Sequence, residues 1–142
     1  MERYVSLDPG KTTGTCILEP SGHMVVTQAS FSHSTLVQYL NALEPTVLIY
    51  ESFQYRRIPN ADLTAVELIG VIKLWGANSE TKLVEQPPSS KVMWDDLKLK
   101  KMDLYKPRNP HSMDALRHML YYVTGHPKEP LRDHFLNMLK ES

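Results

Sequence analysis

The sequence has 142 residues, 42% of them hydrophobic, which suits one globular domain with an ordinary core. Its 16 basic and 16 acidic residues balance, which excludes a surface that is basic throughout but not a local basic patch. No apolar run reaches the roughly 20 residues that span a membrane, and the start of the chain lacks the pattern of a signal peptide. The single cysteine excludes an internal disulfide, so we expect a cytoplasmic protein without contact to a membrane.

The first part of the chain has the pattern of three short strands. Residues 3–8 and 13–18 are rich in apolar and β-branched side chains, and Pro9-Gly10 marks a turn between them. A third strand is predicted within residues 23–31. Three strands joined by short turns form an antiparallel meander, in which Cys16 is expected to be a buried structural thiol.

The rest of the chain alternates helices with strands. The elements expected are a helix that begins after Ser32 or Ser34 and ends at Pro45, a strand over 46–51, a helix over about 61–75 capped by Asn60, a strand over 81–86, a short helix from Ser89 or Ser90, a helix from Pro110 to about 124, and a peripheral terminal helix over about 130–141. The segment 98–108 shows no periodicity and is predicted to be a loop. This order predicts a single α/β domain over residues 1–142, with a five-stranded mixed sheet (antiparallel meander plus parallel strands) flanked by helices.

The helix predicted over 61–75 carries apolar residues around much of its axis. A helix of this kind is buried on more than one side. Two environments satisfy that requirement: a deep position in the core, or an interface shared with a second subunit.

Two of the predicted strands end on a carboxylate, Asp8 and Glu51. If these strands are parallel neighbours, the two side chains lie about 5 Å apart at the edge of the sheet where ligands bind in open α/β folds. The late helix adds His111 and Asp114 on one face of its first turn. Taken singly, Asp8 could be a turn residue, Glu51 an exposed strand end, and Asp114 a residue favoured by the helix dipole. Together they predict a site for Mg²⁺ or Mn²⁺, with two ions that promote phosphoryl chemistry.

Two segments are candidates for contact with a nucleic-acid backbone. The stretch 98–108 carries five cations and one anion, and an aromatic and basic loop follows Glu51. Either one could instead be a solvated surface run. The residues predicted to contact DNA are Phe53, Tyr55, Arg56, Arg57, Lys98, Lys100, Lys101, Lys106 and Arg108.

The sequence resembles the RuvC-type Holliday-junction resolvases of the ribonuclease H-like nucleases. The resemblance covers residues 3 to about 124 and is carried by five pieces: Leu7-Asp8-Pro9-Gly10 with Thr13-Gly14, Ile49-Tyr50-Glu51, Gly70, Pro87-Pro88-Ser89-Ser90-Lys91-Val92, and His111-Ser112-Met113-Asp114-Ala115-Leu116. It implies a ribonuclease H-like fold and a homodimeric endonuclease of recombination and repair that uses Mg²⁺ or Mn²⁺, with the long central helix in the dimer interface.

The resemblance also implies roles for single residues. Asp8, Glu51 and Asp114 correspond to metal-binding catalytic carboxylates, and His111 falls where family members have an aspartate or a histidine. Lys91 corresponds to a basic residue near the DNA or the scissile phosphate.

We therefore expect a metal-dependent hydrolase of branched DNA, chiefly of Holliday junctions. The alternatives are a nuclease of the same fold that acts on structured RNA or on a broader range of branched DNA, and an inactive junction-binding module. A kinase-like ATPase shares this type of strand–turn–strand start, but such proteins usually need two domains of this type.

Overall fold

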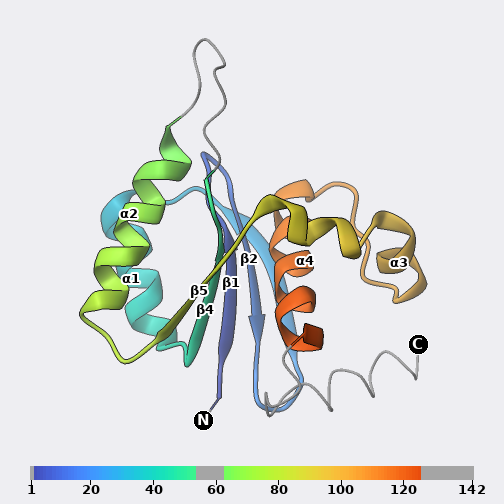
Figure 1. Ribbon diagram of the computed structural model, residues 1–142, viewed down its shortest axis with the longest axis horizontal. Coiled ribbons are helices and arrows are strands. Elements are labelled where there is room, and N and C mark those ends of the chain that lie inside the picture. The colour runs from blue at the N-terminus through green and yellow to red at the C-terminus, as the bar shows by residue number, and fades with distance from the viewer. Residues whose placement is uncertain (1, 54–62, 126–142) are drawn as a thin grey trace.

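The computed structural model describes residues 2–53 and 63–125, and it contains a five-stranded sheet with helices on both of its faces (Figure 1). The strands are β1 (Tyr4–Asp8), β2 (Thr13–Leu18), β3 (Met24–Ala29), β4 (Val47–Glu51) and β5 (Lys82–Gln86). The helices are α1 (His33–Leu43), α2 (Thr64–Ala77), the 3-10 helix η1 (Pro88–Met93), α3 (Asp96–Lys101) and α4 (Pro110–Gly125). No helix in the described part of the chain is long and apolar enough to cross a membrane.

The sheet has the strand order β3-β2-β1-β4-β5. The first three strands pair antiparallel, whereas β1 pairs with β4, and β4 with β5, in parallel. Both the antiparallel meander and the parallel crossovers predicted from the sequence are confirmed. The parallel pairing brings the carboxyl ends of β1, β4 and β5 to one edge, because parallel strands all point the same way.

A separate hydrophobic core fills each face of the sheet. Helices α1 and α2 lie together on one face, and α4 lies on the other (Figure 1). Helix α4 packs its buried residues against β1 and β2, and Tyr4 and Tyr122 meet edge to face in this core with ring centroids 6.0 Å apart. Cys16 is fully buried in the same core, as expected.

The ends of α1 follow from local chemistry. Ser32 caps its start in a capping box with Thr35, so each side chain accepts a hydrogen bond from the other residue's backbone N–H. The helix ends at Leu43, and Glu44 adopts a left-handed conformation (φ 48°) before Pro45. Of the two predicted caps, the structure therefore selects Ser32.

Two predictions about helices need correction. The segment 98–108 is not a loop throughout, because α3 begins at Asp96, whose neighbour Asp95 caps the helix by accepting a hydrogen bond from the Lys98 N–H. The central helix α2 begins at Thr64. Only one side of this helix is buried in the described monomer, so it is not a deep core helix. Asn60, the predicted cap of α2, and the predicted terminal helix over 130–141 lie outside the described residues.

Candidate active site

Three carboxylates from three elements converge at the carboxyl edge of the sheet. Leu7 of β1 pairs with Tyr50 of β4, so the next residues, Asp8 and Glu51, end neighbouring strands. Their side chains are joined by a hydrogen bond. Asp114, on the first turns of α4, lies close enough for its charge to act on Asp8. The predicted convergence of these side chains is therefore present in the fold.

The ammonium group of Lys91 lies between two of these carboxylates. Its Nζ atom is 2.8 Å from Glu51 Oε1 and 3.3 Å from Asp114 Oδ2. Lys91 belongs to η1, which follows the edge strand β5 directly. The ammonium group is therefore positioned at the site by the chain segment that leaves the end of this strand. Burial alone would lower the pKa of Lys91, but the surrounding carboxylates outweigh it and raise this pKa, so the side chain stays charged.

The surroundings of Asp8 disfavour the ionised form of its carboxyl group. Burial, together with the hydrogen bond to Glu51 and the charges of Glu51 and Asp114, raises the pKa of Asp8 well above the usual range. Burial would also raise the pKa of Glu51, but hydrogen bonds from His118, Asp8 and Lys91 lower it overall. The two carboxyl groups therefore share a proton, as neighbouring carboxylates do when too little positive charge lies between them.

A second layer of polar residues surrounds the carboxylates. His118 is fully buried, and its two ring nitrogens contact Glu51 Oε1 (3.1 Å) and Gln86 Oε1 (2.7 Å). The sequence allowed two interpretations of His118, a partner of the site residues or a partly exposed helix residue, and its burial selects the first. Arg117 donates to Asp114 Oδ1 (2.9 Å), and reading the sequence missed this residue as well as Gln86. The spacing of three residues after Asp114 was the signal that could have found Arg117.

His111 occupies a different environment from the other predicted site residues. It lies in the first turn of α4 and is exposed. In the described part of the chain, its ring forms no hydrogen bond or ion pair with the three carboxylates. The sequence thus placed His111 at the correct end of α4, but its role as a ligand stays a prediction.

The described residues contain no group of three carboxylate, imidazole or thiol side chains already arranged around one metal position. Lys91 occupies the space where Glu51 and Asp114 approach each other. The side chain of Asp8 is hydrogen-bonded to that of Glu51. The chemistry of the donor set nevertheless fits Mg²⁺ or Mn²⁺: three oxygen ligands, excess negative charge and a shared proton that a cation would displace. Asp8, Glu51 and Asp114 are therefore the residues that would hold a divalent ion.

The cations predicted to contact DNA lie near this edge of the fold. Lys98, Lys100 and Lys101 are exposed on α3, and Lys106 and Arg108 are exposed in the connection to α4. Helix α3 follows η1 closely, as Figure 1 shows. Phe53 is partly exposed beside Glu51 and Lys91, and the predicted contacts Tyr55, Arg56 and Arg57 fall outside the described residues.

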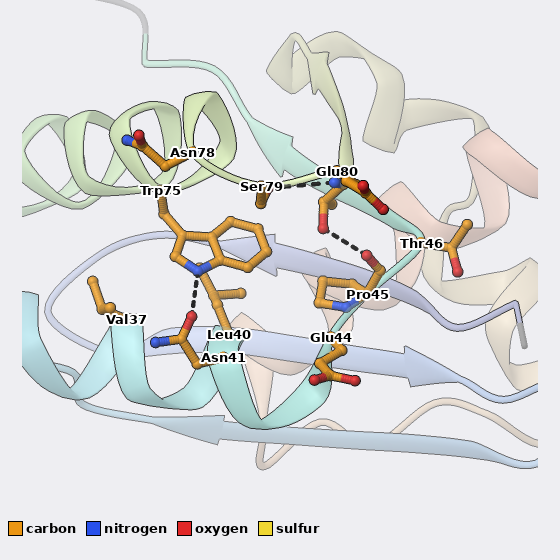
Figure 2. A pocket seen from close by; sticks show the side chains of 11 residues that line it. Val37, Leu40, Asn41, Glu44, Pro45, Thr46, Trp75, Asn78, Ser79 and Glu80 are labelled. Carbon is orange, nitrogen blue, oxygen red and sulfur yellow. Dashed lines mark hydrogen bonds between the residues drawn. The ribbon is translucent and has the colours of Figure 1, made fainter.

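A hollow of about 810 Å³ lies at the opposite end of β4, between α1 and α2 (Figure 2). Trp75 stands at its centre and donates a hydrogen bond to Asn41 Oδ1 (2.8 Å), and Thr46 marks its position before the start of β4. Ligands of open α/β sheets bind at the carboxyl ends of the strands. This hollow is therefore separate from the site formed by the carboxylates.

The fold is similar to that of solved Holliday-junction resolvases. RuvC from T. thermophilus in complex with a Holliday junction matches with a TM-score of 0.64 and 14% identity, over 85% of this chain and 92% of that chain. A second structure of Thermus thermophilus RuvC gives 0.59 and 15%, over 84% and 92%. The yeast mitochondrial Holliday-junction resolvase Ydc2 gives 0.54 and 13%, over 99% and 84%.

No protein-family model and no curated protein sequence matches the chain. Identities of 13–15% relate the folds alone. The strand order, with an antiparallel meander joined to two parallel strands, agrees with that relationship. The chain therefore has a ribonuclease H-like fold in the form found in RuvC-type Holliday-junction resolvases.

Proposed function

We propose that the protein is a divalent-metal-dependent endonuclease that hydrolyses phosphodiesters in branched DNA, chiefly in four-way junctions. The observation that carries this proposal is the convergence of Asp8, Glu51 and Asp114 at the carboxyl edge of the sheet, with Lys91 between them. The similarity of the fold to RuvC bound to a Holliday junction supports the same choice of substrate.

Each residue has a distinct task in the proposed reaction. Asp8, Glu51, Asp114 and His111 would hold Mg²⁺ or Mn²⁺. The bound ions supply activation of the attacking water and neutralisation of charge on the phosphodiester. Lys91, displaced from the carboxylates, would then direct its ammonium group to a phosphate oxygen, because its chain is flexible and its charge is retained.

Contact with DNA would extend from the site over α3. Lys98, Lys100 and Lys101 present three positive charges on six residues of helix. Phosphate contacts of this kind release counterions, so junction binding should weaken steeply as the salt concentration rises. A steep salt dependence of junction binding would distinguish a DNA-binding surface from a run of charges that contact only solvent.

A homodimer is part of the same proposal. Helix α2 exposes the apolar residues Val66 (41%) and Leu74 (70%), and Leu63, immediately before the helix, is 54% exposed. An exposed apolar surface of this kind favours contact with another protein surface, and a second copy would place two active sites on one junction.

The test is cleavage of a synthetic mobile four-way junction with Mg²⁺ or Mn²⁺, comparing the wild type with Asp8→Asn. We expect the variant to fold and bind the junction but not to cut it. Normal cleavage by Asp8→Asn would refute the site. A flap and a structured RNA serve as parallel substrates, and preferential cleavage of the RNA would refute the choice of branched DNA.

A further inference from the structure

Arg117 and His118 lie on α4 three and four residues after Asp114, on the face that borders the candidate site. Neither residue supplies an oxygen ligand, yet both are largely inaccessible: the His118 side chain is 0% exposed and that of Arg117 is 13% exposed. We propose that they are positioning residues, with His118 orienting Glu51 and Arg117 orienting Asp114 for metal binding. The inference rests on the proposed metal-dependent function.

His118 is held between the ends of two neighbouring strands. Its Nε2 atom lies 3.1 Å from Glu51 Oε1, and because an ionised carboxylate only accepts hydrogen bonds, Nε2 is the donor. Its Nδ1 atom lies within 2.7 Å of the side-chain amide group of Gln86, the residue of β5 that pairs with Glu51. The imidazole cannot turn without losing both contacts, so it fixes the direction in which Glu51 points.

Arg117 joins Asp114 to Trp94, which follows η1, and to Asp96, the first residue of α3. Its Nε donates to the Trp94 carbonyl oxygen (2.8 Å), and its Nη2 forms an ion pair with Asp96. With the guanidinium anchored in this way, Nη1 donates to Asp114 Oδ1 at 2.9 Å. The other carboxylate oxygen, Oδ2, faces Lys91 at 3.3 Å. Arg117 thus decides which oxygen of Asp114 is turned toward the site.

Positioning and simple charge effects predict opposite results for Arg117. A guanidinium beside Asp114 adds positive charge to the site, so on electrostatic grounds alone its removal should tighten the binding of a divalent cation. If Arg117 instead orients the ligand, its removal should weaken that binding. Loss of residues that orient metal ligands typically costs tenfold to a hundredfold in affinity. The direction of the change therefore separates the two roles.

The experiment is calorimetric titration of the full chain with Mn²⁺ in the absence of DNA. We expect Arg117→Met and His118→Phe each to raise the dissociation constant by about tenfold or more relative to the wild type. Arg117→Lys keeps the charge but loses the planar fork, and it should remain weak. The matched control is Lys73→Met, which removes one cation from the surface ion pair with Glu85 (4.0 Å) and should bind Mn²⁺ as the wild type does.

Three outcomes would overturn the inference: unchanged or tighter binding by Arg117→Met, full recovery by Arg117→Lys, or unchanged binding by His118→Phe. If circular dichroism shows that His118→Phe does not fold, His118→Gln takes its place. Its amide can still donate to Glu51, so it should recover binding closer to the wild type than His118→Ala does, and equal loss in both would contradict an orienting hydrogen bond.

The Mn²⁺ titration would give different results if the proposed metal-dependent function itself were wrong. If the wild type binds no Mn²⁺, or if Asp8→Asn binds it equally well, the proposed metal site is wrong. If Asp8→Asn loses binding while the Arg117 and His118 variants keep it, the metal site stands and only the positioning roles are refuted.

Discussion

Replacing Gly14 with alanine should separate α4 from the sheet at the candidate site. Gly14 lies on β2 opposite Asp8, and the first turn of α4 passes directly over it. A Cβ atom at this position would lie 1.8 Å from the His111 carbonyl oxygen, 2.3 Å from the His111 carbonyl carbon and 2.8 Å from the Ser112 nitrogen. All three are backbone atoms, so no side-chain rotation can relieve the contact.

The size of the effect follows from this geometry. Carbon atoms are essentially never found within 3.0 Å of such neighbours, so the start of α4 must move by more than about 1 Å. Overpacking of this kind typically costs about 1–3 kcal/mol in the free energy of unfolding. Asp114 moves with the helix, and a displacement of about 1 Å at a reacting centre can lower the rate roughly 100-fold.

The assay compares junction cleavage and urea denaturation for the wild type, Gly14→Ala and the control Gly125→Ala. Gly125 ends α4, and an added Cβ there would meet no atom of the described residues within 4 Å. We expect the control to cleave at the wild-type rate and to unfold at a similar urea concentration. Wild-type cleavage and stability in Gly14→Ala would refute the close contact between β2 and α4.

Further predictions concern the lysine of the candidate site, the cysteine, a helix cap and the proposed dimer. Lys91→Met leaves Glu51 and Asp114 without the cation that bridges them. Thermal unfolding without metal should therefore show a loss of about 1–2 kcal/mol in the free energy of unfolding, and Mn²⁺ should reverse it. A loss that persists with Mn²⁺ would contradict this reasoning. Burial raises the pKa of Cys16 to about 12, against a weaker opposing hydrogen bond with Ser6, so the thiol is neutral below that pH and should react with iodoacetamide only after unfolding. Because the folded state holds this proton more tightly, the contribution of Cys16 to stability should decline as pH rises from about 9 toward 12, which urea denaturation can follow. Ser32→Ala removes the capping box and should cost about 1 kcal/mol in urea denaturation without slowing cleavage. Leu74→Arg should shift light scattering from a dimer to the 16.3 kDa monomer, and an unchanged dimer would exclude this surface as the interface.

Local patterns in the sequence were sufficient to predict most of the elements that build the site. Asp8 and Glu51 could be found because each interrupts an apolar run at its end, and the short turns after β1 and β2 required antiparallel pairing. Helix α3 escaped prediction because it has only six residues and buries only Leu99, which is too short for a hydrophobic period to appear. Its cap depends on one side chain, Asp95, in a segment dominated by charge.

The sequence by itself determined which strands end on carboxylates and that Asp114 lies near the start of a helix, because these features depend on neighbours along the chain. Only the tertiary structure decided what surrounds those carboxylates. Lys91 reaches Asp114 across 23 positions of sequence, and His118 reaches Glu51 across 67. Contacts of this kind arise when parallel strands end at one edge and α4 packs across it, and no local periodicity records them. The orientation of the predicted metal ligands is therefore a property of packing rather than of any one segment.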